Sequence, residues 1–202
     1  MSDDEEMKKA PVELTPCDVM ASRPHEEYGP HIAGHSLRGA TVDQSTVMDS
    51  FALTMLTYRY ARVIDDRNFP GLHELFTDDA TVDYGHPAAT SVPIGDHIRA
   101  QAGRTDLPVT HHMFFNHEFD IHGDTARGRF RMMAQHIRDD VPGGAFLLLG
   151  GGYEHSYRRS IDGWRITSLQ FRAKWGWGNP AVLNGWFAEV TQILPCTRRE
   201  HV

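Results

Sequence analysis

An acid and a histidine in this sequence could move a proton together. Asp65 and Asp66 end a segment with helical periodicity, and projection at 100° per residue separates them. Asp66 lies four residues after Arg62, a spacing that favours an exposed ion pair, whereas Asp65 projects away from that side. Asp65 therefore needs another partner, and the best candidate is His112 in the segment Thr-His-His-Met (residues 110–113).

This pairing predicts proton abstraction. A neutral histidine has a pKa suited to removing a proton next to a leaving group. A buried carboxylate on the other ring nitrogen fixes the tautomer and stabilises the imidazolium that forms. Two alternatives remain open from the residues alone. His112 could be a structural histidine, or its neighbour His111 could face inward if the strand register slips by one.

The elements that must position these side chains follow from periodicity. We expect a helix over residues 43–66, a short helix over 72–76, a strand over 80–84 and a helix that starts at Ile94 with Asp96 near its cap. Long strands are expected over 111–121, 125–138, 144–159 and 163–175, joined by Gly-containing hairpins. This order predicts an α+β fold with one curved antiparallel sheet and helices on one face.

Period-two alternation assigns one face of each long strand to a common interior. Together with Tyr58 and Tyr60 on the first helix, the predicted lining is His112, Phe114, Asn116, Phe130, Met132, His136, Leu149, Tyr153, Phe171 and Trp175. An apolar cavity with few polar groups is typical of a small-molecule site. The alternative is that the same residues only pack the core against the helices.

Composition narrows the function classes. The chain has 202 residues and a net charge of −7 without a basic block, which argues against nucleic-acid binding. The acidic N-terminus and the lack of an apolar run of about 20 residues predict no signal peptide and no membrane span. Cys17 and Cys196 are expected to be free thiols in a reducing compartment, so we predict a cytoplasmic protein.

The two ends of the chain are expected to lie outside the central domain, residues 43–178. Residues 1–42 predict an extended or disordered arm, since they have little apolar periodicity. Their histidines at 25, 31 and 35 have no compact metal-binding spacing, and we predict no metal site. Residues 179–202 are expected to form a C-terminal strap or a last helix.

Several short motifs, taken in order, resemble the SnoaL-like family. They are Tyr60 followed by Asp65, Leu-Phe-Thr-Asp-Asp-Ala (75–80), Thr-His-His-Met-Phe-Phe-Asn (110–116), Gly-Gly-Tyr-Glu-His-Ser-Tyr (151–157) and Asp-Gly-Trp-Arg-Ile (162–166). The similarity spans residues 45–176 and extends to the superfamily of ketosteroid isomerase, scytalone dehydratase, bile-acid 7α-dehydratase and hexachlorocyclohexane dehydrochlorinase. It implies a cone-shaped α+β barrel, with the N-terminal helices packed in the concave face of the sheet.

The resemblance also implies roles for single residues. The histidine base and orienting aspartate of the dehydratase and dehydrochlorinase branches match His112 and Asp65, and the dehydratases' pocket tyrosine matches Tyr60. Two polar positions of the bile-acid enzymes are Ala134 and Ala173 here, so the pocket is expected to be more apolar and less suited to a carboxylate. His136 is the residue that could supply a polar contact instead.

These implications predict a cofactor-independent lyase or isomerase. The expected substrate is a lipophilic cyclic molecule such as a polyketide, terpenoid or steroid, and β-elimination is expected ahead of isomerisation or cyclisation. The alternative is a non-catalytic ligand-binding or assembly subunit, like the β-subunits of ring-hydroxylating dioxygenases. The resemblance further implies a homo-oligomer, with a trimer ahead of a dimer.

Overall fold

The first helix delivers the candidate residues to the sheet. In the computed structural model, which describes residues 43–85, 91–106 and 108–184, α1 spans Gln44–Asp65. The carboxylate of Asp43 caps it by accepting a hydrogen bond from the Ser45 amide. Leu53, Leu56 and Tyr60 lie on its buried side, so the helix predicted over 43–66 is confirmed.

The remaining elements follow in the order η1, β1, β2, α2, β3, β4, β5, β6 and η2. Their bounds are Phe69–Glu74, Phe76–Asp83, Val92–Pro93, Ile94–Ala102, Val109–His122, Thr125–Ile137, Phe146–Ser160, Gly163–Gly178 and Pro180–Leu183. The predicted helix over 72–76 is displaced. The chain forms a 3₁₀ turn that begins beside Pro70 and ends at Glu74, and Phe76 already pairs with Ile166 of β6.

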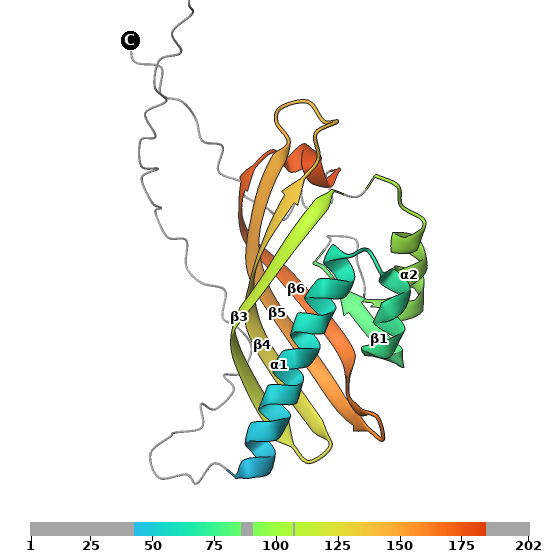
Figure 1. The fold of residues 1–202 in the computed structure, drawn as a ribbon, viewed down its shortest axis with the longest axis vertical. Helices are drawn as coiled ribbons and strands as arrows, with labels where there is room; N and C mark the ends of the chain where they lie inside the picture. Colours follow the sequence, from blue (N-terminus) through green and yellow to red (C-terminus); the bar gives the residue numbers. More distant parts are fainter. Residues whose placement is uncertain (1–42, 86–90, 107, 185–202) are drawn as a thin grey trace, which may run out of the picture. The chain divides into compact units, whose positions relative to one another are not determined.

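The strands form one sheet in the order β2-β1-β6-β5-β4-β3. Strands β3 to β6 form an antiparallel meander, whereas β1 pairs with β6 in parallel, for example Thr81 with Ser168. Figure 1 shows α1 along one face of the curved sheet, and α1 packs mainly on the edge strand β3. The α+β fold is confirmed, with a mixed sheet because of the β1–β6 pair.

Two of the β-bulges in the sheet reverse the alternation of side chains near predicted pocket residues. In β3, Phe115 pairs with Arg131 but Glu118 pairs with Arg129, so one extra residue lies between them. In β6, an extra residue separates the partners of Gly150 and Gly151, which are Trp175 and Ala173. Beyond each bulge the side chains that the alternation predicts to face inward face outward.

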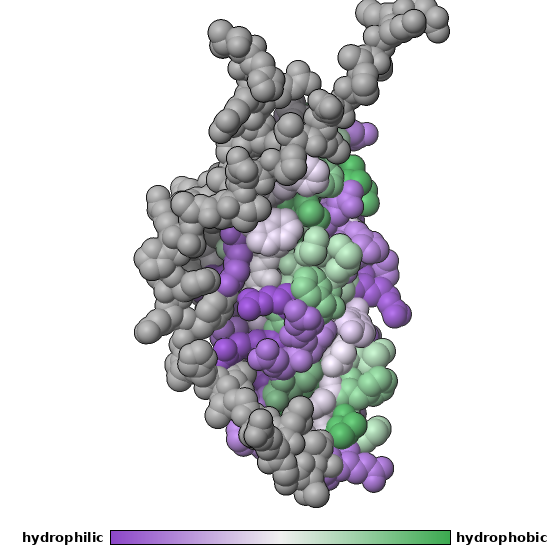
Figure 2. Space-filling view, turned by 90° about the vertical axis from the view of Figure 1, so that its left-hand side faces the viewer, coloured by the Kyte–Doolittle hydropathy of each residue, from purple (hydrophilic) through white to green (hydrophobic). Residues whose placement is uncertain are grey.

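The outer face of the sheet mixes charged and apolar side chains. Arg127 and Arg131 of β4 are exposed on it. The exposed apolar residues include Met113 and Phe115 of β3 and Trp177 of β6. Figure 2 shows hydrophilic and apolar side chains adjoining each other on one side of the molecule. Self-association as a trimer or dimer stays a prediction.

Some sequence predictions fall where the structure gives no description. The expectations for residues 1–42, for Cys17 and Cys196 and for residues 185–202 lie outside the described residues. Within the expected C-terminal strap, the described part is the short η2 turn. No helix in the described ranges is both long and apolar enough to cross a membrane.

Candidate active site

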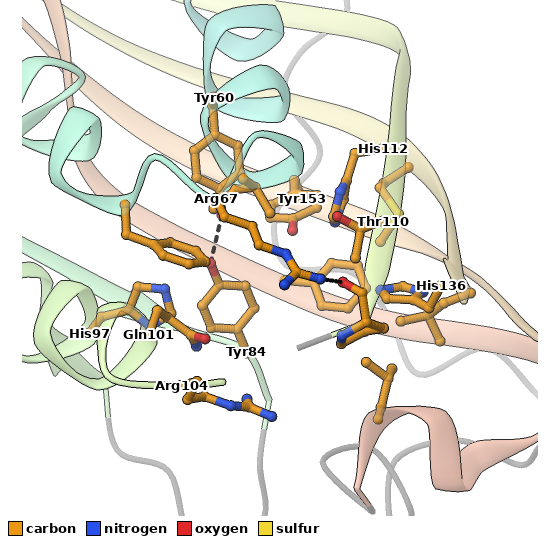
Figure 3. Close-up of a pocket in the computed structure, with 17 residues that line it drawn as sticks. Tyr60, Arg67, Tyr84, His97, Gln101, Arg104, Thr110, His112, His136 and Tyr153 are labelled. Carbon is orange, nitrogen blue, oxygen red and sulfur yellow. Dashed lines mark hydrogen bonds between the residues drawn. The ribbon is translucent and has the colours of Figure 1, made fainter. Parts of the chain in front are cut away.

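A cavity opens between the C-terminal end of α1, the helix α2 and the inner face of the sheet (Figure 3). It holds about 810 Å³ of empty space when its open mouth is included. The lining residues are Tyr60, Ile64, Arg67, Phe69, Tyr84, His97, Gln101, Arg104, Pro108, Thr110, His112, Met132, His136, Leu149, Tyr153, Phe171 and Leu183. Its mainly apolar wall with a few polar groups is typical of a small-molecule pocket.

Asp65 and His112 meet at the wall of this cavity. His112 Nδ1 lies 2.6 Å from Asp65 Oδ1, and the His112 backbone amide donates to Asp65 Oδ2 at 2.9 Å. Because an ionised carboxylate only accepts hydrogen bonds, the proton of the neutral ring lies on Nδ1. His112 lines the cavity, so Nε2 remains as its basic nitrogen there. His111 is exposed, which answers the question of register.

The position of β3 at the edge of the sheet explains how Asp65 can accept hydrogen bonds from both the backbone and the side chains of this strand. Half of the amides of an edge strand point away from its single neighbour, and Asp65 satisfies one of them. Thr110, two residues before His112 on the same face, donates its hydroxyl to Asp65 Oδ1 at 2.8 Å. One helical carboxylate thus joins α1 to two inward-facing residues of β3.

These hydrogen bonds keep Asp65 ionised. Burial on its own would raise the pKa of Asp65, and the C-terminal end of a helix is also an unfavourable place for a negative charge. The hydrogen bonds from the His112 ring and amide and from Thr110 outweigh burial, so the pKa of Asp65 lies below its ordinary value. A charged Asp65 can stabilise an imidazolium at His112.

Tyrosine hydroxyls form the second polar group of the cavity. Tyr60 and Tyr84 are joined by a hydrogen bond of 2.6 Å, and Tyr153 packs edge-on against Tyr60. Burial raises the pKa of Tyr84 to about 12 and that of Tyr60 well above its ordinary value. Both hydroxyls therefore keep their protons at neutral pH, and one of them donates its proton to the other.

The rings of His136 and His112 lie next to each other in the cavity wall. Their ring centroids lie 5.9 Å apart, and His136 Nδ1 is buried with no hydrogen-bond partner among the described residues. Burial, and secondarily the proximity of His112, lower the pKa of His136 to about 4. His136 is consequently neutral at physiological pH.

The structure brings most predicted pocket residues together. Tyr60, Met132, His136, Leu149, Tyr153 and Phe171 line the cavity with His112. Phe114 and Phe130 lie in the aromatic core beneath it, where Phe114 stacks on Tyr60 and Phe130 on Tyr153.

Three predicted lining residues lie elsewhere. Asn116 and Trp175 follow the bulges in β3 and β6, which turn both side chains to the exposed face. Trp175 instead lies over Gly150, where a Cβ atom would come within 2.0 Å of the indole ring. Tyr58 is 44% exposed and packs edge-on against His117. Tyr58 does not line the cavity, because it lies on a more exposed side of α1 than Tyr60.

Sequence reasoning missed several residues of the wall. Tyr84 and Thr110 belong to segments that were interpreted only as a strand end and as part of a motif. Arg67, His97, Gln101 and Arg104 carry no periodic signal, since they come from the end of α1 and from α2 with the turn after it. Their place depends on the packing of α2 against β1 and η1.

The donor set of the cavity does not resemble a metal site. No cluster of three or more His, Cys, Asp or Glu side chains within the described ranges is arranged to hold a metal ion. Among the lining residues that the structure describes there is no Asp or Glu, because Asp65 stands behind His112.

The fold agrees with the comparisons to known proteins. Residues 45–170 match the SnoaL-like domain, and the chain belongs to this family. An uncharacterized protein of Mycobacterium tuberculosis is 31% identical over 127 residues, which cover 59% of this chain and 82% of the relative. The resemblance drawn from the sequence motifs is therefore confirmed.

Two solved structures show the breadth of the fold. A Novosphingobium aromaticivorans protein, provisionally assigned as a scytalone dehydratase, has a TM-score of 0.59 and 19% identity, covering 65% of this chain and 88% of that one. A hexachlorocyclohexane dehydrochlorinase has a TM-score of 0.56 and 15% identity, covering 64% and 88%. At such identities the likeness establishes a fold shared with dehydratases and dehydrochlorinases.

Proposed function

We propose that this protein is a cofactor-independent lyase or isomerase in which His112, oriented by Asp65, removes a proton from a lipophilic cyclic substrate. The observation that carries the proposal is the 2.6 Å contact between His112 Nδ1 and Asp65 Oδ1 at the wall of a mainly apolar cavity. Elimination of water or another leaving group is the leading reaction. Isomerisation and cyclisation would start with the same proton transfer.

The proposed elimination uses Nε2 of His112 as the base. The substrate C–H bond breaks, its proton goes to Nε2, and its electron pair forms the new double bond while the bond to the leaving group breaks. Asp65 stabilises the imidazolium through the Nδ1 hydrogen bond. In a dehydration, the proton of the imidazolium goes on to the departing hydroxide, and the products are water and an alkene.

The tyrosine pair is the better candidate to assist the departing oxygen. Tyr60 and Tyr84 are protonated donors, and together they can present one hydroxyl hydrogen to the cavity. His136 is neutral, with a pKa of about 4, so it would serve as a hydrogen-bonding group rather than as an acid. We therefore expect Tyr60 and Tyr84, rather than His136, to increase the rate at which the leaving group departs.

Hydrogen exchange into deuterated water tests proton abstraction without knowledge of the natural substrate. We would incubate the full chain with 1-tetralone, a bicyclic ketone with acidic α-hydrogens, and follow deuterium incorporation by NMR. Wild type should exceed the buffer rate, and His112→Ala should not. A bicyclic β-hydroxy ketone, followed by the absorbance of the enone product, tests elimination in the same way.

The outcome also separates catalysis from binding. If wild type and His112→Ala exchange tetralone at the same rate although both bind it, His112 is structural. The non-catalytic ligand-binding or assembly role is then the better explanation. Co-purification with a larger oxygenase subunit would support that alternative further.

A further inference from the structure

Gln101 of α2 is a buried polar residue at the wall of the candidate active site. It is 7% exposed and lines the cavity. Its side-chain amide forms no hydrogen bond with the residues that the structure describes. The amide is also not among the described polar atoms that are sealed from solvent without a partner, so it is reached from the cavity. A buried amide whose donor and acceptor are both unused indicates a binding role, because leaving them unpaired costs stability.

The packing of α2 explains why Gln101 points inward. The buried residues of this helix have the i, i+3, i+4, i+7 spacing of a single helix face, and they are Ile94, His97, Ile98 and Gln101. The two isoleucines belong to the hydrophobic core, and α2 packs against β1 and η1. Gln101 therefore occupies a buried position where an apolar side chain would leave no polar group unpaired.

His97, one turn before Gln101, makes the surroundings of the amide polar but uncharged. Its ring lines the cavity and stacks on Tyr84, with ring centroids 5.2 Å apart. Burial lowers the pKa of His97 to about 4, so the ring is neutral at physiological pH. Tyr84 is neutral as well, because burial raises its pKa to about 12. The α2 side of the cavity thus contains three uncharged polar side chains.

The two arginines of the cavity wall have partners of their own. Arg104, in the turn after α2, forms a two-point ion pair with Asp106, with Nε–Oδ1 at 3.0 Å and Nη2–Oδ2 at 3.2 Å. Arg67 donates a hydrogen bond from Nη2 to Pro108 O at 2.7 Å. Both guanidinium groups are therefore engaged within the protein, whereas the amide of Gln101 has no hydrogen-bond partner in the described ranges.

Gln101 and the proposed base face the cavity from different elements. Gln101 lies on α2, which packs on β1, whereas His112 lies on β3. Strands β1 and β3 are separated in the sheet by β6, β5 and β4. Figure 3 shows Gln101 and His97 on one side of the cavity and His112 and Thr110 on the other. A substrate that reaches both sides must therefore present different atoms to Gln101 and to His112.

We propose that Gln101 is a specificity-determining residue of this cavity and binds an uncharged oxygen group of the substrate, a hydroxyl or a carbonyl. The substrate class is then a lipophilic cyclic molecule with an oxygen group at the end that lies against α2, away from the carbon that His112 deprotonates. The proposal rests on the proposed function in taking the cavity as the substrate site. A primary amide suits this role, because its NH₂ group donates to an oxygen and its carbonyl accepts from a hydroxyl. An analogue without the oxygen leaves the amide unpaired and binds less well.

Two probes of nearly equal size test the oxygen preference. We would measure binding of 7-hydroxy-1-tetralone and 7-methyl-1-tetralone to the full chain by titration calorimetry, in wild type and in Gln101→Met. Methionine has nearly the length of glutamine, favours helices and offers no strong hydrogen bond. The ratio of the two affinities should shift about fivefold toward the methyl probe in Gln101→Met, as expected for the loss of one neutral hydrogen bond. An unchanged ratio, or binding of neither probe by wild type, would overturn the proposal.

The unfolding temperature separates binding from a structural role. Gln101→Met removes an unpaired buried amide, so it should unfold no earlier than wild type. If it unfolds markedly earlier and binds both probes equally weakly, Gln101 is structural and the proposal is wrong. Gln101→Leu is a second apolar variant and should shift the ratio in the same direction. The matched control is Gln44→Met, the same substitution at the exposed start of α1, which should leave the ratio unchanged.

Two further measurements check the assignment. His97→Phe keeps a ring that can stack on Tyr84 and removes the ring nitrogens. A shifted ratio in His97→Phe but not in Gln101→Met would move the assignment to His97 and overturn the proposal. A third probe, 1-tetralone with a carboxylate at position 7, carries a charge at the same place. If it binds wild type more tightly than both neutral probes, the recognised group is an anion and the proposal is wrong.

Tetralone exchange keeps the two proposals distinct. If exchange depends on His112 while the affinity ratio does not depend on Gln101, the proposed function stands and this inference falls. If the ratio depends on Gln101 while no exchange depends on His112, this inference stands and the catalytic role falls.

Discussion

Two histidines of β3 form hydrogen-bond contacts with α1, and their partners on this helix are chemically different. His112 meets the carboxylate of Asp65 near the C-terminal end of α1, with Nδ1 2.6 Å from Oδ1. His117, beyond the bulge in β3, meets the hydroxyl of Thr57 two turns earlier in α1, with Nε2 2.9 Å from Oγ1. The first lies on the cavity wall, whereas the second stacks between Phe119 and Phe130.

The partners fix opposite tautomers. Asp65 can only accept, so His112 carries its proton on Nδ1. Thr57 donates its own hydroxyl proton to Thr54 O at 2.7 Å, and His117 therefore carries its proton on Nε2 and donates it to Thr57. A hydroxyl brings no charge to stabilise an imidazolium, and burial lowers the pKa of His117. The comparison supports the proposed role of His112 as the proton acceptor, whereas His117 is arranged to remain neutral.

The largest expected difference comes from the same substitution at both histidines. His112→Gln removes the base and should abolish tetralone exchange and elimination, although a ligand still binds. His117→Gln should keep the rate near wild type, since the amide can still donate to Thr57. Rates and unfolding temperatures of both variants would be measured together. A folded His117→Gln that is as inactive as His112→Gln would contradict the distinction between them.

The second largest difference in rate is expected from substitutions of Asp65 and Thr57, the helix partners of the two histidines. Asp65→Asn keeps the shape but loses the charge and favours the wrong tautomer of His112. It should lower the rate by up to about 10⁴-fold, as the equivalent change does in a serine protease. Thr57→Val removes one buried hydrogen bond and should cost about 1 kcal/mol of stability without a large change in rate. Asp65→Asn with full activity would leave the carboxylate a purely structural role.

How far the sequence predicts this site depends on local regularity. Helical projection placed Asp65 inward and Asp66 outward, and alternation placed Phe130, Met132 and His136 correctly, because α1 and β4 have no irregularity. Alternation failed at Asn116 and Trp175, because each follows a bulge that one sequence does not reveal.

The parts that sequence reasoning missed depend on long-range packing. Tyr84 reaches Tyr60 because β1 pairs in parallel with β6, and parallel pairing carries no local pattern. Arg67 enters the cavity because its backbone is left-handed, a conformation predicted for glycine or asparagine rather than arginine. The contact between His112 and Asp65 could be predicted from one chain, whereas the other polar groups of the cavity wall could not.

A smaller kinetic effect is expected from the tyrosine pair. Tyr60→Phe and Tyr84→Phe each break their shared hydrogen bond of 2.6 Å, and each should lower the rate of elimination by about 10²-fold. Tetralone exchange has no leaving group and should fall less. The ratio of the two rates separates assistance to the leaving group from assistance to proton abstraction. Equal losses in both reactions would mean that the tyrosines only shape the cavity.

The smallest expected effect concerns stability and pH, and it extends the comparison to histidines without any carboxylate. Burial lowers the pKa of His136 to about 4 and that of His155 to about 3. His155 is fully enclosed by aromatic rings, and its Nε2 has no hydrogen-bond partner among the described residues. Both side chains are neutral in the folded protein and take up a proton near pH 6.5 once the chain unfolds.

The sign of the pH dependence follows from these lowered values. Between pH 6.5 and about 4 the unfolded chain binds more protons than the folded one, so the free energy of unfolding falls as the pH falls. Each such histidine contributes at most about 1.4 kcal/mol per pH unit. Carboxylates whose pKa lies below the ordinary value, such as Asp65, begin to lose their stabilising effect below about pH 5. His155→Phe removes one titrating group and should reduce the loss of stability between pH 6.5 and 4.5, measured by urea unfolding at several pH values. An unchanged slope in this variant would mean that His155 is protonated in the folded protein, and the contrast with His112 would then fail.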